Sequence, residues 1–286
     1  MKSAFNRSVL AGSVILAVIF LIGLSAPFLG TRDPSEIDPI SRNKRPGAVR
    51  ALTGADGQQR STTYWMGTDS LGRDIYSRVL YGARVSMLVG ISVALISIAA
   101  GLVIGLLAGY IRWLDGFVMR IMDGLMAVPA ILLAIALVSL STAGLRAVIL
   151  AIVIPEVPRV VRLVRSVVLS IREEPYVEAA IALGARTVPL IVRHVLPNAL
   201  APLIVQATYV CASAIVIEAI LSFLGVGIPP QTPTWGNIMA EGRSLFRVFP
   251  HNILFPGIFL AATVLAVNIM GDGLRDSLDP RLRNRL

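Results

Sequence analysis

The sequence has very little of what a disulfide-stabilised or metal-dependent protein needs. Its 286 residues include a single cysteine, Cys211, and two histidines, His194 and His251. One thiol forms no intrachain disulfide and no cysteine-based metal cluster, so cysteine usage leaves the redox compartment undetermined. The two histidines lie far apart in the chain and lack the spacing of metal ligands. The sequence therefore predicts no metal site.

Charged and aromatic residues are also scarce. They make up 15% and 6% of the chain, against 55% hydrophobic residues and a mean hydropathy of +0.76. The net charge of +9 comes from basic residues placed between and beside apolar runs, not from one patch interleaved with aromatic rings. This pattern excludes nucleic-acid binding and favours an anionic lipid surface. The predicted solvent is a bilayer.

Motifs for catalysis are absent from the sequence. It contains no His-Glu-x-x-His, no evident Ser-His or paired intramembrane Asp arrangement, and no Gly-x-x-x-x-Gly-Lys-Ser/Thr loop to cradle phosphate. The chain is therefore predicted not to be an enzyme, and any ATP chemistry must come from a partner. No internal repeat is evident, which argues against a single-chain secondary transporter. A passive channel, a scaffold and a membrane-embedded enzyme remain alternatives.

Six apolar runs are long enough to cross a bilayer as helices. They fall at 9–29, 85–110, 117–141, 145–165, 199–224 and 252–272. The first resembles a signal peptide in its charge order, but its length and Pro27 favour an uncleaved span. Pro155 and Pro158 interrupt the fourth run. The predicted fold is an all-α polytopic membrane protein with six transmembrane helices.

The runs divide the chain into segments whose orientation follows from short-loop lysine and arginine. The bias places both termini in the cytoplasm, with a tip and first span at 1–29, an extracytoplasmic loop at 30–84, a five-helix core at 85–272 and a tail at 273–286. A cytoplasmic loop at 171–198 interrupts the core. The loop at 30–84 is strongly basic, but a loop of that length translocates with less regard to charge. Its first half contains three prolines and little apolar periodicity, which predicts irregular structure.

The polar stretch around 171–200 predicts a helix-turn-helix. Pro175 suits the first turn of a helix over 176–183, and Gly184 suits the left-handed position after it. Thr187 is predicted to cap a second helix that Pro197 ends. Another protein could grip such an element and move two spans as one lever.

Glu178, Ala179 and Ala180, followed by Gly184 and then Leu196-Pro197, resemble the EAA loop of ABC-importer permeases. The family's usual isoleucine two residues before Leu-Pro is His194 here. The resemblance implies the type I ABC-importer permease fold and a loop that docks on the ATP-hydrolysing subunit. The implied coupling residues are Tyr176, Glu178, Ala179, Ala180, Gly184, Ala185, Leu196 and Pro197.

Three further segments resemble the second permease of dipeptide, oligopeptide and nickel systems. They are 66–86, beginning Met-Gly-Thr-Asp-Ser-Leu-Gly-Arg-Asp, then 218–236 and 271–280. The resemblance implies an inner-membrane assembly with a second homologous permease, two ATPases that hold ATP and Mg, and an extracytoplasmic binding protein; this chain itself binds no cofactor. It also implies transport by alternating access. Peptide is the predicted substrate and nickel or another small solute the alternative, because no cluster of Cys, His or Met lines a span.

Four polar residues are candidates for the pathway or for structural roles. Glu218 lies within a span, where an ionisable group is costly and usually faces a cavity or a partner. Asp69, Arg73 and Asp74 precede the second run and either contact substrate or form a capping and ion-pair network; the network is the favoured interpretation.

Other charged and small residues suggest packing. Arg120 and Asp123 are spaced to pair on one helix face. Arg159, Arg162 and Arg165 either line an anion path or, as we favour, anchor to lipid phosphates. Small residues predict close packing against a partner. These are Gly90, Gly101, Gly105 and Ala108.

Overall fold

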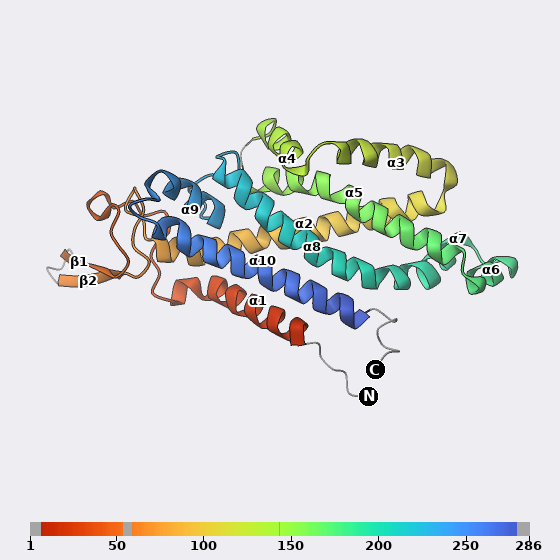
Figure 1. Ribbon diagram of the computed structural model, residues 1–286, viewed down its shortest axis with the longest axis horizontal. Coiled ribbons are helices and arrows are strands. Elements are labelled where there is room, and N and C mark those ends of the chain that lie inside the picture. Colours follow the sequence, from red (N-terminus) through yellow and green to blue (C-terminus); the bar gives the residue numbers. More distant parts are fainter. Residues whose placement is uncertain (1–6, 54–58, 143, 279–286) are drawn as a thin grey trace.

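The computed structural model describes residues 7–53, 59–142 and 144–278. They form an elongated bundle of helices with a small β-hairpin at one end (Figure 1). The long helices and the bent pair are α1 (Arg7–Ser25), α2 (Ile75–Tyr110), α3 (Arg112–Ala127), α4 (Ala130–Ser139), α5 (Leu145–Arg172), α8 (Leu196–Phe223) and α10 (His251–Leu278). Shorter elements are α6 (Pro175–Ala182), α7 (Thr187–Leu190), α9 (Trp235–Gly242) and the 3-10 turns Ala26–Phe28, Pro39–Ser41 and Arg243–Leu245.

The six predicted runs correspond to α1, α2, the α3–α4 pair, α5, α8 and α10. Among the described residues, four helices are long and apolar enough to cross a membrane, or up to five if the bent pair counts as one span. The remaining predicted span is α5, which has 28 residues but carries charges through its length, among them Glu156 and Arg159. A helix with such charges needs partners inside the bundle.

Two helix boundaries differ from the sequence prediction. α2 begins at Ile75 and not near residue 85, since the Asp74 side chain accepts a hydrogen bond from the Ser77 backbone and caps the helix there. α10 extends to Leu278, so most of the predicted tail at 273–286 that the structure describes is helical.

Proline acts differently in the two central runs. The third run is broken into α3 and α4 by a 90° bend, because Pro129 holds Val128 in an extended conformation. Pro155 and Pro158 were predicted to interrupt the fourth run, but α5 continues through both prolines as one helix. Packing against α2 and α8 on its buried face keeps that helix continuous despite the lost backbone hydrogen bonds.

The loop predicted at 30–84 is more ordered than its prolines suggested. β1 (Ala48–Thr53) and β2 (Gln59–Tyr64) pair antiparallel, with Ala48 opposite Tyr64. Tyr64 is 1% exposed, and its hydroxyl donates to Ser41 Oγ at 3.1 Å. The prediction of irregular structure holds for residues 31–47, apart from the 3-10 turn Pro39–Ser41. It is wrong for the hairpin, because the prolines lie outside the strands and a buried tyrosine fastens the hairpin to the preceding segment.

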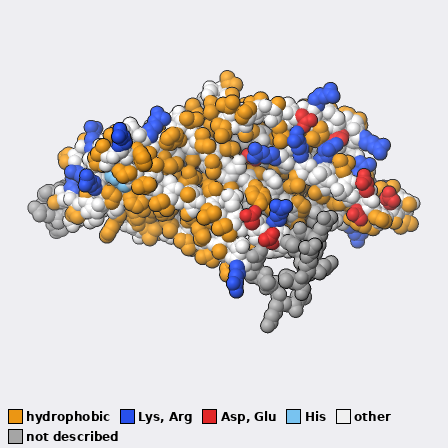
Figure 2. Space-filling model, in the orientation of Figure 1, with side chains coloured by type: hydrophobic (Ala, Val, Ile, Leu, Met, Phe, Trp, Pro, Cys, Tyr) orange, Lys and Arg blue, Asp and Glu red, His pale blue; other side chains and the backbone are white. Residues whose placement is uncertain are grey.

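The surface has the distribution expected of a bilayer protein. Figure 2 shows hydrophobic side chains across the middle of the visible face, with lysine and arginine gathered toward both ends. Exposed large side chains include Leu21 of α1, Leu95 of α2 and Ile258 of α10, each more than half exposed. An apolar surface of this extent is stable in lipid and unstable in water.

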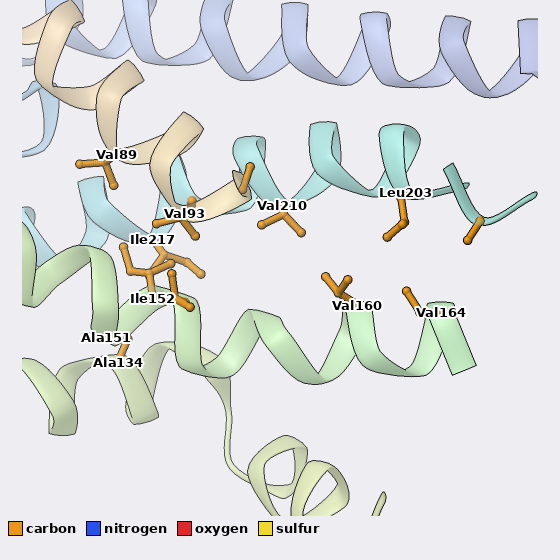
Figure 3. Packing of buried hydrophobic residues seen from close by; sticks show 14 of the residues in the cluster. Val89, Val93, Ala134, Ala151, Ile152, Val160, Val164, Leu203, Val210 and Ile217 are labelled. Carbon is orange, nitrogen blue, oxygen red and sulfur yellow. The ribbon is translucent and has the colours of Figure 1, made fainter. Parts of the chain in front are cut away.

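The core is built where α2, α5 and α8 meet (Figure 3). Three glycines of α2, one per turn, lie against three valines of α5, and a Cβ on each glycine would come within 2.5, 2.7 and 2.8 Å of the valine Cβ. The pairs are Gly101 with Val160, Gly105 with Val164 and Gly109 with Val168. The predicted packing of these small residues against a partner protein is therefore wrong: the contact lies within the chain.

Replacing Gly105 with leucine is expected to push α2 and α5 apart. The added side chain has no space beside Val164, and overpacking of this kind costs about 1–3 kcal/mol of stability. Thermal unfolding of the purified chain in detergent measures the loss. Gly116→Leu in α3 is the matched control, because no atom lies within 4 Å of a Cβ at that position. Equal melting of the two variants would contradict the packing argument.

Candidate functional site

A short helix and a tight turn project from one end of the bundle. Figure 1 shows α6 and α7 beyond α5 and α8, at the end where α1 begins and α10 finishes. After α6, Gly184 has φ +85°, its backbone N–H donates to Ile181 O at 2.9 Å, and Ala185 N–H donates to Ala180 O at 3.0 Å. This pair of bonds is a Schellman cap, which requires a left-handed residue. The predicted short helix and its glycine cap are confirmed.

The loop combines an exposed outer face with buried anchors. Tyr176 is 46% exposed and Leu183 89% exposed, whereas Val177, Leu190 and Val195 are buried against the core of α5 and α8. Most of the coupling residues implied by the resemblance are exposed on this face: Tyr176, Glu178, Ala179, Gly184, Ala185 and Pro197. Ala180 and Leu196 are half-buried. An apolar face held on rigid anchors at a bundle end is suited to a protein partner.

The second arm of the loop is not a separate helix. Residues Thr187–Phe223 form one helix of 37 residues, in which Ile191–Val195 is a π-helical turn. Pro197 was predicted to end the arm, but Leu196 N–H donates to Ile191 O across five residues, and the wider turn accommodates the proline. Thr187 does not cap, since Arg186 holds the N-cap position without a side-chain bond. A displacement at α7 therefore passes directly into α8.

Asp69 and Arg73 belong to a buried ion-pair network at the opposite end of the bundle. Arg73 Nε lies 2.7 Å and Arg78 Nη1 2.7 Å from Asp69 Oδ2, and both arginines also pair with Glu241. Burial lowers the pKa of Arg73, but hydrogen bonding and charge from Glu241 and Asp69 outweigh it and raise that pKa above its ordinary value. The network joins the start of α2 to α9, and it is the structural alternative to substrate contact.

Asp74 is the N-cap of α2. Its Oδ2 accepts from Ser77 N at 3.0 Å and from Ser77 Oγ. The side chain is 8% exposed, and burial raises the pKa of the carboxyl above its ordinary value despite the hydrogen bonds from Ser77. A carboxyl whose pKa is raised by folding destabilises the folded state when it is charged. Its contribution to the free energy of unfolding therefore falls as the pH rises from the pKa of the unfolded state to the pKa of the folded state.

Asp74→Asn is therefore expected to be at least as stable as the native chain at pH 8 and to lose stability relative to it as the pH falls to 4. The amide caps the helix without carrying charge. Melting in detergent across this pH range measures the effect. Asp33→Asn is a control of opposite sign, because hydrogen bonds from Ser35 lower the pKa of Asp33. A pH slope unchanged in Asp74→Asn would contradict the assignment.

Glu218 is fully buried and lies away from any hollow. Ser222 Oγ donates to its Oε1 at 2.8 Å, while Oε2 has no hydrogen-bond partner among the described residues. Ser86 of α2 and Thr234, at the start of α9, face the same carboxyl. Of the two roles predicted for Glu218, this packing favours the structural one, because α2 and α9 cover that side of α8 within this chain.

A groove follows the other side of α8. A hollow of about 580 Å³ lies between α4, α5, α8 and α10, with Arg159, Tyr209, Ser213 and Asn268 as its polar lining residues. A second hollow of about 560 Å³ shares Tyr209 and continues along α8 to Pro197. We call the two together the α8 groove. It connects the middle of the bundle with the base of the α6–α7 loop.

Three arginines of α5 pair with carboxylates. Arg162 Nη2 lies 2.6 Å from Asp123, and Arg165 Nη2 lies 2.7 Å from Asp115, both in α3. The predicted pairing of Asp123 with Arg120 is therefore wrong, and α3 is fastened to α5 instead. Arg159 pairs with Glu156 within α5 at 3.2 Å. The arginines that were predicted to anchor to lipid phosphates therefore pair with carboxylates of this chain.

Sequence reasoning missed two parts of this arrangement. Glu241 had no signal in the sequence, because it pairs with arginines more than 160 positions away. Glu156 stood out between two prolines, but only the folded chain places Ser213 beside it, with Ser213 Oγ donating to Glu156 Oε1 at 2.9 Å.

Comparison with solved structures identifies the same architecture. The chain superposes on a subunit of "Inward facing conformations of the MetNI methionine ABC transporter: CY5 native crystal form" with a TM-score of 0.59, covering 72% of this chain and 98% of that one. It also matches "Crystal structure of an amino acid ABC transporter with histidines" with a TM-score of 0.51 over 74% of this chain and 95% of that one. Sequence identities of 19% and 15% make these likenesses of fold alone.

Curated sequences resemble the chain much more closely. The "Probable peptide ABC transporter permease protein y4tQ" of Sinorhizobium fredii is 50% identical over 277 residues, 97% of this chain and 90% of the relative. The "Dipeptide transport system permease protein DppC" of Alkalihalophilus pseudofirmus is 40% identical over 280 residues, 98% of this chain and 88% of the relative. The family "Binding-protein-dependent transport system inner membrane component" matches residues 101–284. The chain belongs to this family and is a multi-pass permease subunit of an ABC importer.

Proposed function

We propose that this permease carries short peptides inward across the bacterial inner membrane by alternating access. The observation that carries the proposal is the continuity of the Thr187–Phe223 helix, which ends in the exposed loop at one end and lines the α8 groove along its length. A pull on the loop moves the wall of the groove without an intervening hinge. The same helix therefore links the contact with the ATPase to the α8 groove.

The substrate class is supported by the names of the relatives. They include the peptide permease of Sinorhizobium fredii, the dipeptide permease of Alkalihalophilus pseudofirmus and a "Glutathione transport system permease protein GsiD" of Pectobacterium atrosepticum, which is 43% identical over 225 residues. All three names describe peptides or a peptide-like molecule. The apolar walls and few polar groups of the groove suit such a substrate.

The proposed assembly contains a second homologous permease, two ATPases that hold ATP and Mg, and an extracytoplasmic binding protein. The α6–α7 loop docks on an ATPase, with Glu178, Ala179, Ala180 and Gly184 at the contact. Both termini are cytoplasmic, since α1 begins and α10 ends at the same end of the bundle as this loop (Figure 1). The hairpin and α9 lie at the other end, where they can meet the binding protein.

The proposal is tested by uptake of labelled dipeptides into proteoliposomes that hold the full assembly with ATP inside and the binding protein outside. ATP-dependent accumulation of peptide, and none of Ni²⁺, supports it. Accumulation of Ni²⁺ in place of peptide would overturn the substrate class. Flux of either solute without ATP would indicate a channel and overturn the coupled mechanism.

A further inference from the structure

A buried carboxylate fixes one arginine at the wall of the α8 groove. Glu156 is 0% exposed and accepts from Ser213 Oγ of α8 at 2.9 Å and from Arg159 Nη1 at 3.2 Å. Both bonds hold the carboxylate between α5 and α8. The Arg159 side chain is 47% exposed and lines the hollow of about 580 Å³. Glu156 therefore holds one edge of the guanidinium, and the rest of the guanidinium is open toward the groove.

The free donors of Arg159 have the geometry of a carboxylate site. Within the part of the chain that the structure describes, Nη1 is the nitrogen that bonds to Glu156, and neither Nε nor Nη2 makes a hydrogen bond. A guanidinium presents these nitrogens as a planar fork that matches both oxygens of a carboxylate. Arg165 differs, because Asp115 of α3 accepts from both its Nε and its Nη2, and Arg162 differs because it pairs with Asp123 and does not line this hollow.

The surroundings of Arg159 add a place for the rest of a ligand. The same hollow has apolar walls from Val216, Ile220 and Val264, and its other polar side chains are Tyr209, Ser213 and Asn268. A volume of about 580 Å³ lies within the usual range for small-molecule sites, about 300–1,000 Å³. A charged arginine on a membrane-spanning helix is costly in a bilayer and is typically retained for a ligand or pathway.

We propose that Arg159 binds the carboxylate of a peptide substrate in the α8 groove, with Glu156 and Ser213 as positioning residues. The proposal rests on peptide transport as the function and adds a contact point to it. The substrate's carboxylate takes the open edge of the guanidinium, while its apolar side chain lies against α8 and α10. Glu156 balances the charge of Arg159 when no substrate is present, so an empty groove does not bury an unpaired cation.

The test measures peptide binding by the assembled permease pair and ATPases in nanodiscs without the binding protein. The probe is a radiolabelled dipeptide that contains a photoreactive phenylalanine analogue. Its cross-linking is measured in the presence of one of two competitors, alanyl-phenylalanine or alanyl-phenylalanine amide. The acid is expected to compete at a concentration roughly tenfold or more below that of the amide, because charge-assisted hydrogen bonds contribute about 1.5–3 kcal/mol.

Variants separate recognition from folding. Arg159→Gln is expected to remove the preference for the acid, and so is Arg159→Gln with Glu156→Gln, which deletes both charges and leaves no buried carboxylate unpaired. Arg162→Gln is the matched control, since that arginine pairs with Asp123 outside the groove, and it is expected to keep the preference.

The result that overturns the inference alone is native uptake of peptide with equal competition by acid and amide, or an acid preference that persists in both Arg159 variants. Absence of both peptide uptake and cross-linking in the native assembly would overturn the proposed function together with the inference.

Discussion

Replacing Gly184 with arginine is expected to lower ATP-dependent uptake by roughly 100-fold while leaving the permease folded. Gly184 has φ +85°, a conformation that strains any other residue, and no atom of the described residues lies within 4 Å of a Cβ built there. The new side chain therefore projects into the proposed contact with the ATPase instead of into the permease. Loss of a central interface contact costs about 2–4 kcal/mol, which corresponds to this factor.

The measurement compares uptake, ATPase stimulation by liganded binding protein, and co-purification of the ATPases with the permease. Gly225→Arg is the matched control. Gly225 follows α8 at the opposite end of the bundle, has φ +83° and also has nothing within 4 Å of a Cβ. Both variants carry the same strain and the same side chain, so a difference between them reports on docking at the loop.

A second variant in the same loop tests the charge at the contact. Glu178 is exposed on α6, so Glu178→Lys disturbs no buried group of this chain. It is expected to reduce uptake in the same way as Gly184→Arg and to leave melting unchanged. Normal uptake in both loop variants, or equal loss in Gly225→Arg, would contradict docking of the ATPase at this loop.

The parts of the fold that sequence reasoning predicted depend on local chemistry. The short helix α6 follows from Pro175 and ends at Gly184, whose need for a left-handed backbone is readable from the sequence alone. The apolar runs predicted α1, α8 and α10 because a span must satisfy its own backbone. In each of these cases the decisive residues are close together in the chain.

The parts that sequence reasoning missed depend on contacts between distant residues. Pro197 is a helix stop by local rules, yet a π-helical turn carries the helix past it because packing of Val195 and Ala199 holds both sides in the core. Asp123 has a neighbour of opposite charge on its own helix but pairs with Arg162, 39 positions away. Glu218 lies in a span as predicted, but only the packing of α2 and α9 decides that it does not face the groove.

The two faces of the α8 groove differ in charge, because α5 contributes Arg159 and α8 contributes uncharged side chains. The polar side chains that α8 presents to the groove include Ser213, Gln206 and Tyr209. α5 holds the arginines, and its ion pairs with α3 fasten it to the bent helix pair. A movement of α8 relative to α5 would strain the Ser213–Glu156 hydrogen bond, so the position of the loop is linked to the anchoring of Arg159.

The largest stability effect is expected for Arg78→Met at the opposite end of the bundle. Arg78 is 0% exposed and pairs with Asp69 at 2.7 Å and Glu241 at 2.5 Å. Removing it leaves the buried Asp69 and the partly buried Glu241 with Arg73 as their remaining cation, and breaking a buried pair in this way costs about 3–5 kcal/mol. Melting of the purified chain in detergent is expected to fall by about 10 °C or more.

Two comparisons make the Arg78 result interpretable. In Arg162→Met the lost pair is half-exposed, with side chains 46% and 59% accessible, so the expected cost is below about 1 kcal/mol. In the double variant Arg78→Met with Glu241→Gln, a neutral Arg73–Asp69 pair remains, and part of the lost stability is expected to return. Melting that is equal in Arg78→Met and Arg162→Met, or unchanged by the second substitution, would show that charge balance does not hold α9 to α2. Recovery of stability in the double variant would instead assign the loss of stability to the unpaired carboxylate of Glu241, because methionine replaces Arg78 in both the single and the double variant.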